Sequence, residues 1–240
     1  MKEASVLKVR IKFEKTGAVR FVGHLDTMRY FQKAIRRSGL KPAFSEGFSP
    51  HMIMSFAAPL GVGTESHGEY FDIELREEIS SSEIIAQLNQ EMAEGFKVLD
   101  AVKIPDMKSW NAMAQVAAAD YRVSFREGKE PRFDWAGRIG GFLEQEDIPF
   151  VKEGKNGPRQ VNLRPNIYRM EAGDGFLFLR LASASANYTR PEQVTEAYAS
   201  WAGEKLVPYA LRICRLEVLA DAGEDAAERF VPLLALGERI

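Results

Sequence analysis

The sequence predicts an α+β protein, and three observations carry this prediction. A chain of 240 residues with 45% hydrophobic content is long enough for one large domain or two small ones. Segments with strand and helix periodicity follow the order βαββαβ along the first half, which is the split βαβ arrangement. The second half repeats this order. We therefore expect two tandem ferredoxin-like (βαββαβ) halves packed together.

The first half is predicted to contain four strands and two helices. Residues 6–13 alternate apolar and charged side chains, which indicates a half-buried strand with Lys8, Arg10 and Lys12 on its polar face. A helix is expected to begin near residues 24–26 and to stop before Gly39. The remaining expected elements are strands at 53–57, 70–75 and 96–104 and a helix at 82–94.

The second half is predicted to contain the same set of elements. Asp134 is a candidate cap for the helix at 133–146, and Pro191 stands at the first position of the helix at 191–202. The A-G-D-G sequence at 172–175 is typical of a hairpin turn. The expected strands are 120–126, 162–170, 175–181 and 211–219.

These elements predict two domains and a tail. Residues 1–105 form a domain with the GHLD and SEGFSPH motifs, and residues 120–220 form the second. The join at 105–119 contains Trp110 and could form a short helix. The tail at 221–240 begins polar and acidic but ends F-V-P-L-L-A-L, so we expect its apolar end to pack back on a domain.

Composition narrows the classes of function. The chain contains no run of eighteen apolar residues and no apolar signal-peptide core near its N-terminus, so no membrane span is expected. The single cysteine, Cys214, excludes an internal disulfide and a multi-cysteine metal site, and its apolar surroundings favour a buried structural thiol. The expected compartment is the cytoplasm.

Charge is distributed unevenly along the chain. Residues 1–45 have a net charge of +8, whereas residues 46–119 have a net charge of -8, although the whole chain has only -2. This asymmetry favours an acidic partner, such as nucleic acid or an acidic protein surface. The alternative is that the two blocks pair with each other within one domain.

Two motifs place histidines beside carboxylates. G-H-L-D puts His24 and Asp26 at a predicted helix start, where they could act as a base with its neighbour or as half of a metal site. The alternative is that Asp26 caps the helix and His24 fills the turn. F-S-E-G-F-S-P-H contributes Glu46, Ser49 and His51, which would meet His24 and Asp26 if this loop folds towards the helix. Such a cluster could hold a metal or support acid–base catalysis, although no ligand spacing calls for it.

A third motif, P-L-G-V-G-T-E-S-H-G-E-Y, is rich in glycine. A dinucleotide loop requires a helix after its glycines, whereas a strand is expected here, so nucleotide binding is rejected and no cofactor is expected. Glu65, Ser66 and Glu69 could still line a cleft.

Two basic clusters are candidate contacts for RNA or an acidic partner. In the first helix, Arg29, Lys33 and Arg36 or Arg37 fall on one face. The second cluster consists of Lys152, Lys155, Arg159, Arg164 and Arg169. Both could equally be solvated surface. The expected R-G-F/Y-x-F strand is missing, which argues against a standard RNA-recognition motif.

The motifs F-V-G-H-L-D-T-M-R, I-R-R-S-G-L, F-S-E-G-F-S-P-H and P-L-G-V-G-T-E-S, with V-N-L-R-P-N-I in the second half, resemble a bacterial radical-SAM-associated domain family of unknown function, DUF2344. The resemblance implies an accessory role beside a radical SAM protein. The chain lacks C-x-x-x-C-x-x-C and so cannot itself hold the radical cluster. We expect a non-catalytic accessory or substrate-binding partner that acts on RNA. The alternative is a metal- or acid/base-dependent enzyme that uses His24, Asp26, Glu46 and His51.

Overall fold

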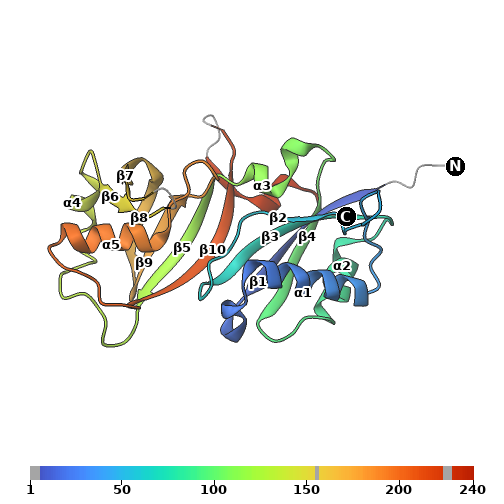
Figure 1. The fold of residues 1–240 in the computed structure, drawn as a ribbon, viewed down its shortest axis with the longest axis horizontal. Helices are drawn as coiled ribbons and strands as arrows, with labels where there is room; N and C mark the ends of the chain where they lie inside the picture. Colours follow the sequence, from blue (N-terminus) through green and yellow to red (C-terminus); the bar gives the residue numbers. More distant parts are fainter. Residues whose placement is uncertain (1–5, 155–156, 224–228) are drawn as a thin grey trace. The chain divides into compact units, whose positions relative to one another are not determined.

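The computed structural model describes residues 6–154, 157–223 and 229–240. The chain divides into two compact units (Figure 1). The first unit comprises the chain up to Ala117 and again from Glu217 onward, and the second comprises Ala118–Leu216. Both contain antiparallel strands and few helices, which confirms the α+β prediction. These bounds differ from the predicted domains, because the predicted tail belongs to the first unit.

The first unit has a sheet with two helices on one face. The strands lie in the order β4-β1-β3, with β2 also paired to β3, and these three pairs are antiparallel. Phe31 and Ile35 of the first helix and Ile84 and Leu88 of the second are fully buried against the strands. The elements are β1 (Leu7–Lys15), η1 (Gly17–Phe21), α1 (His24–Arg37), β2 (Met54–Phe56), β3 (Glu65–Leu75), α2 (Ser81–Asn89) and β4 (Phe96–Lys103).

The strand predicted at residues 6–13 with Lys8, Arg10 and Lys12 on its polar face is present as β1, but it is not half-buried, because this polar face is covered as well. Arg10 is fully buried, and its guanidinium donates to both carboxylate oxygens of Asp72 at 2.9 and 3.1 Å. It also donates to the carbonyls of Trp110 and Leu233. The join between the units, with η2 (Lys108–Trp110) and α3 (Ala112–Gln115), and the final turn η4 (Leu233–Leu236) supply these covering groups.

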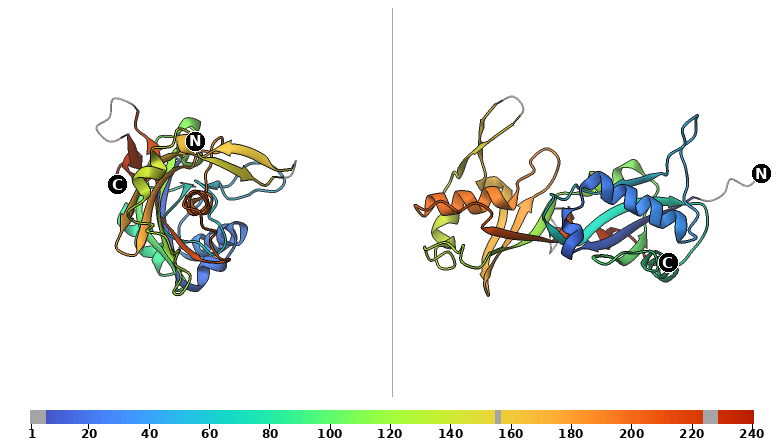
Figure 2. Two further views of the ribbon diagram at one scale, coloured as in Figure 1. Left: turned by 90° about the vertical axis from the view of Figure 1, so that its left-hand side faces the viewer. Right: turned by 60° about the horizontal axis from the view of Figure 1, so that its bottom comes forward.

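The second unit has a similar plan. Its strands lie in the order β10-β5-β9-β8, with the part of β10 up to Leu216 in this unit. Residues of α4 and α5 pack on one face of the sheet, and a separate hairpin is formed by β6 and β7 (Figure 2). The elements are β5 (Ala118–Phe125), α4 (Ile139–Leu143), β6 (Pro149–Lys152), β7 (Arg159–Asn162), η3 (Arg164–Asn166), β8 (Ile167–Gly173), β9 (Phe176–Ala182), α5 (Pro191–Trp201) and β10 (Leu211–Asp221).

Two predicted elements of the second unit differ from the structure. The helix expected at 133–146 is reduced to α4, since Gly140 and Gly141 weaken it and the Asp134 side chain accepts from the Gly137 N–H in a preceding turn. The strand expected at 162–170 is interrupted by η3, because Pro165 has no N–H to donate to a ladder.

The C-terminal prediction is confirmed. Strand β11 (Phe230–Pro232) pairs antiparallel with β10, and Leu233 is fully buried. The join at 105–119 contains short helices, as expected.

Candidate functional site

Helix α1 positions the most distinctive motif of the first unit. Gly23 is its N-cap in an extended conformation, and the Thr27 N–H donates to the Gly23 carbonyl at 2.9 Å. Thr27, Phe31, Ala34 and Ile35 turn towards the sheet, which leaves the opposite face of the helix to polar residues. Gly23 has no side chain with which to cap the helix, and Asp26 lies inside the first turn, so the alternative in which Asp26 is the N-cap is wrong.

His24 and Asp26 have different partners. The His24 ring is half-buried and meets the Phe56 ring edge-to-face, with 5.5 Å between the ring centroids. The Asp26 carboxylate is largely exposed and forms an ion pair with Arg29 at 3.1 Å. His24 therefore has an apolar packing role, while Asp26 belongs to the solvated surface of α1.

The F-S-E-G-F-S-P-H segment forms a loop that Ser45 and His51 close. The Ser45 N–H donates to the His51 carbonyl at 2.9 Å, and the Ser45 hydroxyl lies 2.8 Å from Nδ1 of the His51 ring. Gly47 has a φ of +107°, a conformation that favours glycine, and the loop tip with Glu46 and Ser49 is exposed. In the right-hand view of Figure 2 this segment projects from the first unit.

The metal-site alternative gains no support from this geometry. His51 is bound to Ser45, His24 packs on Phe56 and Asp26 pairs with Arg29. Within residues 6–154, 157–223 and 229–240, no group of three or more His, Cys, Asp or Glu side chains is arranged to hold a metal ion.

Glu65, Ser66 and Glu69 begin strand β3 and have structural surroundings. Glu65 accepts from the Gly17 N–H and from Arg20, both at 3.0 Å, and so ties η1 to the sheet. Ser66 is fully buried opposite Lys15 on β1, and Glu69 is only 3% exposed. These three residues therefore do not line an open cleft.

Sequence reasoning missed two buried polar groups of the first unit. Lys15 is 2% exposed, and its ammonium donates to the Val22 carbonyl just before α1. Tyr70 donates to Glu217 at 2.7 Å, and burial, reinforced by the Glu217 charge, raises the pKa of Tyr70 well above its usual range. The phenol is therefore neutral at physiological pH. An alternating strand pattern could not reveal either group, because it does not show that the chain after β1 turns back onto Lys15 or that Glu217, far along the chain, meets Tyr70.

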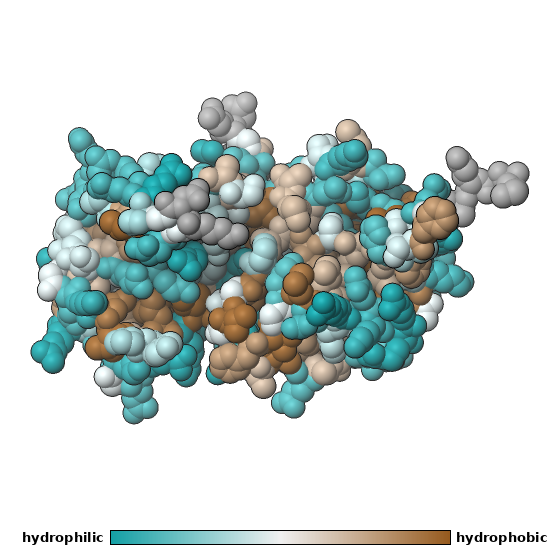
Figure 3. Space-filling model, in the orientation of Figure 1, coloured by the Kyte–Doolittle hydropathy of each residue, from teal (hydrophilic) through white to brown (hydrophobic). Residues whose placement is uncertain are grey.

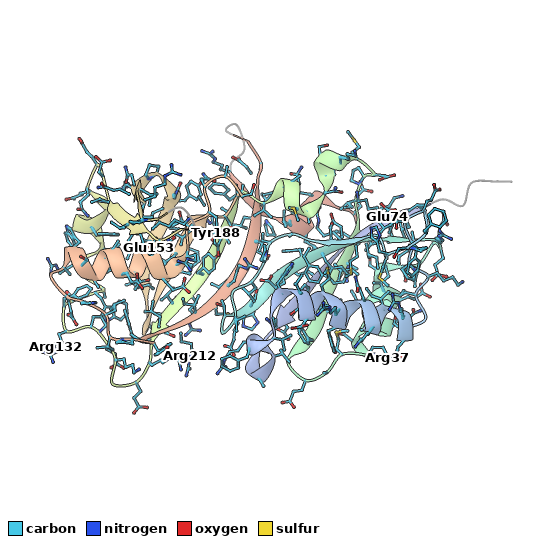
Figure 4. The ribbon with its side chains drawn as sticks, in the orientation of Figure 1. Arg37, Glu74, Arg132, Glu153, Tyr188 and Arg212 are labelled. Atoms are coloured by element: carbon cyan, nitrogen blue, oxygen red, sulfur yellow. The ribbon has the colours of Figure 1, made fainter. Side chains whose placement is uncertain are left out.

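The basic residues of α1 are exposed. Arg29, Lys33 and Arg36 are spaced i, i+4, i+7, and all three lie on the surface. Arg37, at the end of the helix, pairs with Glu91 at 2.6 Å (Figure 4). Among the described residues, Lys33 and Arg36 form no ion pair. Figure 3 shows polar residues over α1 beside apolar ones. Phe21, just before α1, and Leu25, in its first turn, are 61% and 59% exposed.

The second basic cluster is divided among different roles. Arg159 is exposed on β7, whereas the half-buried Arg164 donates to the carbonyl of Leu143, the last residue of α4, at 2.9 Å. Arg164 thereby satisfies a helix end. Lys155 lies outside the described residues.

The fold and these motifs define an α+β protein with an exposed basic helix in its first unit. Residues 8–191 match the family model described as an uncharacterized protein conserved in bacteria (DUF2344). The chain belongs to this family, which confirms that part of the predicted resemblance. The comparison with curated proteins finds no match. No helix of the described residues has the length and apolar character needed to cross a membrane.

Proposed function

We propose that this protein is a non-catalytic accessory or substrate-binding partner of a radical SAM enzyme and that it acts on RNA. The observation that supports RNA as ligand is the exposed stripe of Arg29, Lys33 and Arg36 on α1. Cationic side chains on one helix face attract phosphates and release their counterions. The radical SAM partner is supported by the resemblance of the α1 motif to a family associated with such enzymes.

The three cations of the stripe differ in availability. Arg29 pairs with Asp26, but both side chains are about two-thirds exposed, and an exposed pair of this kind is weak enough to exchange for a phosphate. Lys33 and Arg36 have no ion pair among the described residues. We therefore assign the main phosphate contacts to Lys33 and Arg36, with Arg29 adding to them on binding.

The proposed architecture is a pair of ferredoxin-like halves. It is supported by the strand orders β4-β1-β3-β2 in the first unit and β10-β5-β9-β8 in the second. When only these four strands of each unit are numbered along the chain, without β11 and the separate β6–β7 hairpin, both orders are fourth, first, third and second strand. The proposed compartment is the cytoplasm, which agrees with a single cysteine and no disulfide framework.

The test is a pull-down of the tagged full-length chain from its own host at mild salt, with both proteins and RNA identified. We expect a radical SAM protein and RNA with the wild-type chain. The Lys33→Ala/Arg36→Ala variant should lose most of the RNA. Lys41→Ala is the matched control, since Lys41 is an exposed cation paired with Glu77 beyond the end of α1.

The outcomes separate the parts of the proposal. A folded bait that recovers neither a radical SAM protein nor RNA contradicts it. Equal RNA recovery by the wild-type and Lys33→Ala/Arg36→Ala chains would remove the α1 stripe as the RNA site.

A further inference from the structure

The second unit has a sheet face opposite its helices. Leu177 and Leu179 on β9 are fully buried in the core that includes α4 and α5. Because side chains alternate along a strand, Phe176 and Phe178 lie on the other face, where both are half-buried. Arg122 of β5 and Arg169 of β8 hold their guanidinium groups over these two rings, at 4.4 and 5.1 Å from the centroids.

The charge of this face is net positive. Arg180 forms a bidentate pair with Asp120, and Arg169 forms one with Glu171. Arg212 on β10 is exposed (Figure 4). We call this surface the Phe176–Phe178 face, and it comprises Asp120, Arg122, Arg169, Glu171, Phe176, Phe178, Arg180 and Arg212. The face therefore contains four arginines and two carboxylates.

The position of the two rings in the sheet is that of a known base-stacking platform. Strand β9 lies between β5 and β8 and follows the tight Asp174–Gly175 turn, in which Gly175 has a φ of +72°. Gly175-Phe176-Leu177-Phe178 retains the G-F-x-F part of the strand pattern whose aromatics stack bases in RNA-recognition motifs. Asp174 replaces the basic residue that opens that pattern, which is why the sequence pattern with its leading arginine is missing.

We propose that the Phe176–Phe178 face binds single-stranded RNA, with one base stacking on each ring. Arg122 and Arg169 then leave the rings and contact phosphates. A base stacks on an aromatic ring more strongly than an exposed cation does, and the Arg169–Glu171 pair is exposed, so this exchange is favourable.

The spacing of the rings favours a single strand over a duplex. Residues two apart on a strand are separated by about 6.6 Å, whereas stacked bases are about 3.4 Å apart. The two bound bases must therefore be unstacked from each other, and a duplex keeps its bases stacked. The inference rests on the proposed function only in taking RNA as the ligand, because the site is in the other unit.

The test measures binding of a fluorescent ten-nucleotide oligouridine and of an RNA duplex of equal length to the full chain. We expect the single strand to bind more tightly. Phe176→Leu/Phe178→Leu keeps apolar side chains but removes the rings, and it should weaken single-strand binding by about tenfold per ring. Phe176→Tyr/Phe178→Tyr keeps the rings and should bind like the wild type. Thermal unfolding checks that each variant is folded.

The results distinguish this face from the α1 stripe. Unchanged binding by a folded Phe176→Leu/Phe178→Leu chain overturns the inference and leaves the α1 proposal standing. If the Phe176→Leu/Phe178→Leu chain loses RNA binding while the Lys33→Ala/Arg36→Ala chain binds like the wild type, the result supports the Phe176–Phe178 face and contradicts the α1 stripe as the RNA site. Equal or tighter binding of the duplex overturns stacking, and a wild type that binds neither RNA overturns both proposals.

A crosslinking experiment covers the case in which the leucine variant does not fold. Wild-type protein is irradiated with oligouridine that contains 4-thiouridine, and the crosslinked peptides are identified by mass spectrometry. Crosslinks at Phe176 or Phe178 support the face. Crosslinks confined to α1 overturn it.

Discussion

Replacing Arg10 with alanine should strongly destabilise the first unit. Arg10 is fully buried and donates to Asp72 and to the carbonyls of Trp110 and Leu233. Its removal leaves the Asp72 carboxylate, itself 3% exposed, accepting a hydrogen bond from the Ala112 N–H but without its buried counter-charge. Breaking a buried pair in this way costs about 3–5 kcal/mol.

The assay is urea unfolding followed by Trp110 fluorescence. Trp135 and Trp201 lie in the second unit and are replaced by phenylalanine in all chains compared, so the signal reports on the first unit. Arg10→Ala should lower the free energy of unfolding by the amount given above. Replacing both partners, as Arg10→Met/Asp72→Leu, should recover much of the loss, because no uncompensated charge is then buried.

Two results would refute this reasoning. One is a loss below about 1 kcal/mol for Arg10→Ala, a value typical of an exposed pair. The other is a double variant as unstable as the sum of Arg10→Met and Asp72→Leu, since coupled partners should not be additive.

Three further predictions concern other sites. Lys33→Ala and Arg36→Ala should each reduce the salt slope of RNA binding by about one, whereas an unchanged slope would exclude phosphate contacts. Burial raises the pKa of Tyr198 to about 12, so the contribution of the neutral phenol to stability is full below pH 10 and is lost as the pH rises through 12. The measurement is a spectroscopic titration of tyrosinate, and the absence of a tyrosine that ionises near pH 12 would contradict this prediction. Ser80→Ala should destabilise α2 by about 1 kcal/mol in thermal unfolding, because the hydroxyl caps the helix at the Glu83 N–H; no change in melting temperature would contradict it.

Much of the secondary structure could be predicted from local pattern. The helix expected to begin near residues 24–26 is α1, and Pro191 begins α5 as its fixed φ favours. The Asp174–Gly175 turn joins β8 to β9 in a hairpin. These features depend on a few neighbouring residues, so the sequence contains all the information that they need.

The site was less accessible to sequence reasoning. The histidines and carboxylates of the two motifs suggested convergence, yet Ser45 binds His51 and Phe56 packs on His24. Motif content does not specify which side chains meet, because that depends on how distant segments pack. Phe176 and Phe178 do not match the RNA-recognition pattern because Asp174 stands before Gly175 where that pattern has a basic residue.

The sequence by itself determined the α+β class, the alternation of the strands and the exposed cations of α1, since each depends on local periodicity and turn residues. Only the tertiary structure decided that Arg10 is buried and that Arg164 satisfies the end of α4. Each depends on a partner distant in the chain: Arg10 meets Leu233, and Arg164 meets Leu143. The sequence does not show whether water or a buried carbonyl accepts the hydrogen bonds of a charged side chain. The packing of distant segments determines which of the two is the acceptor.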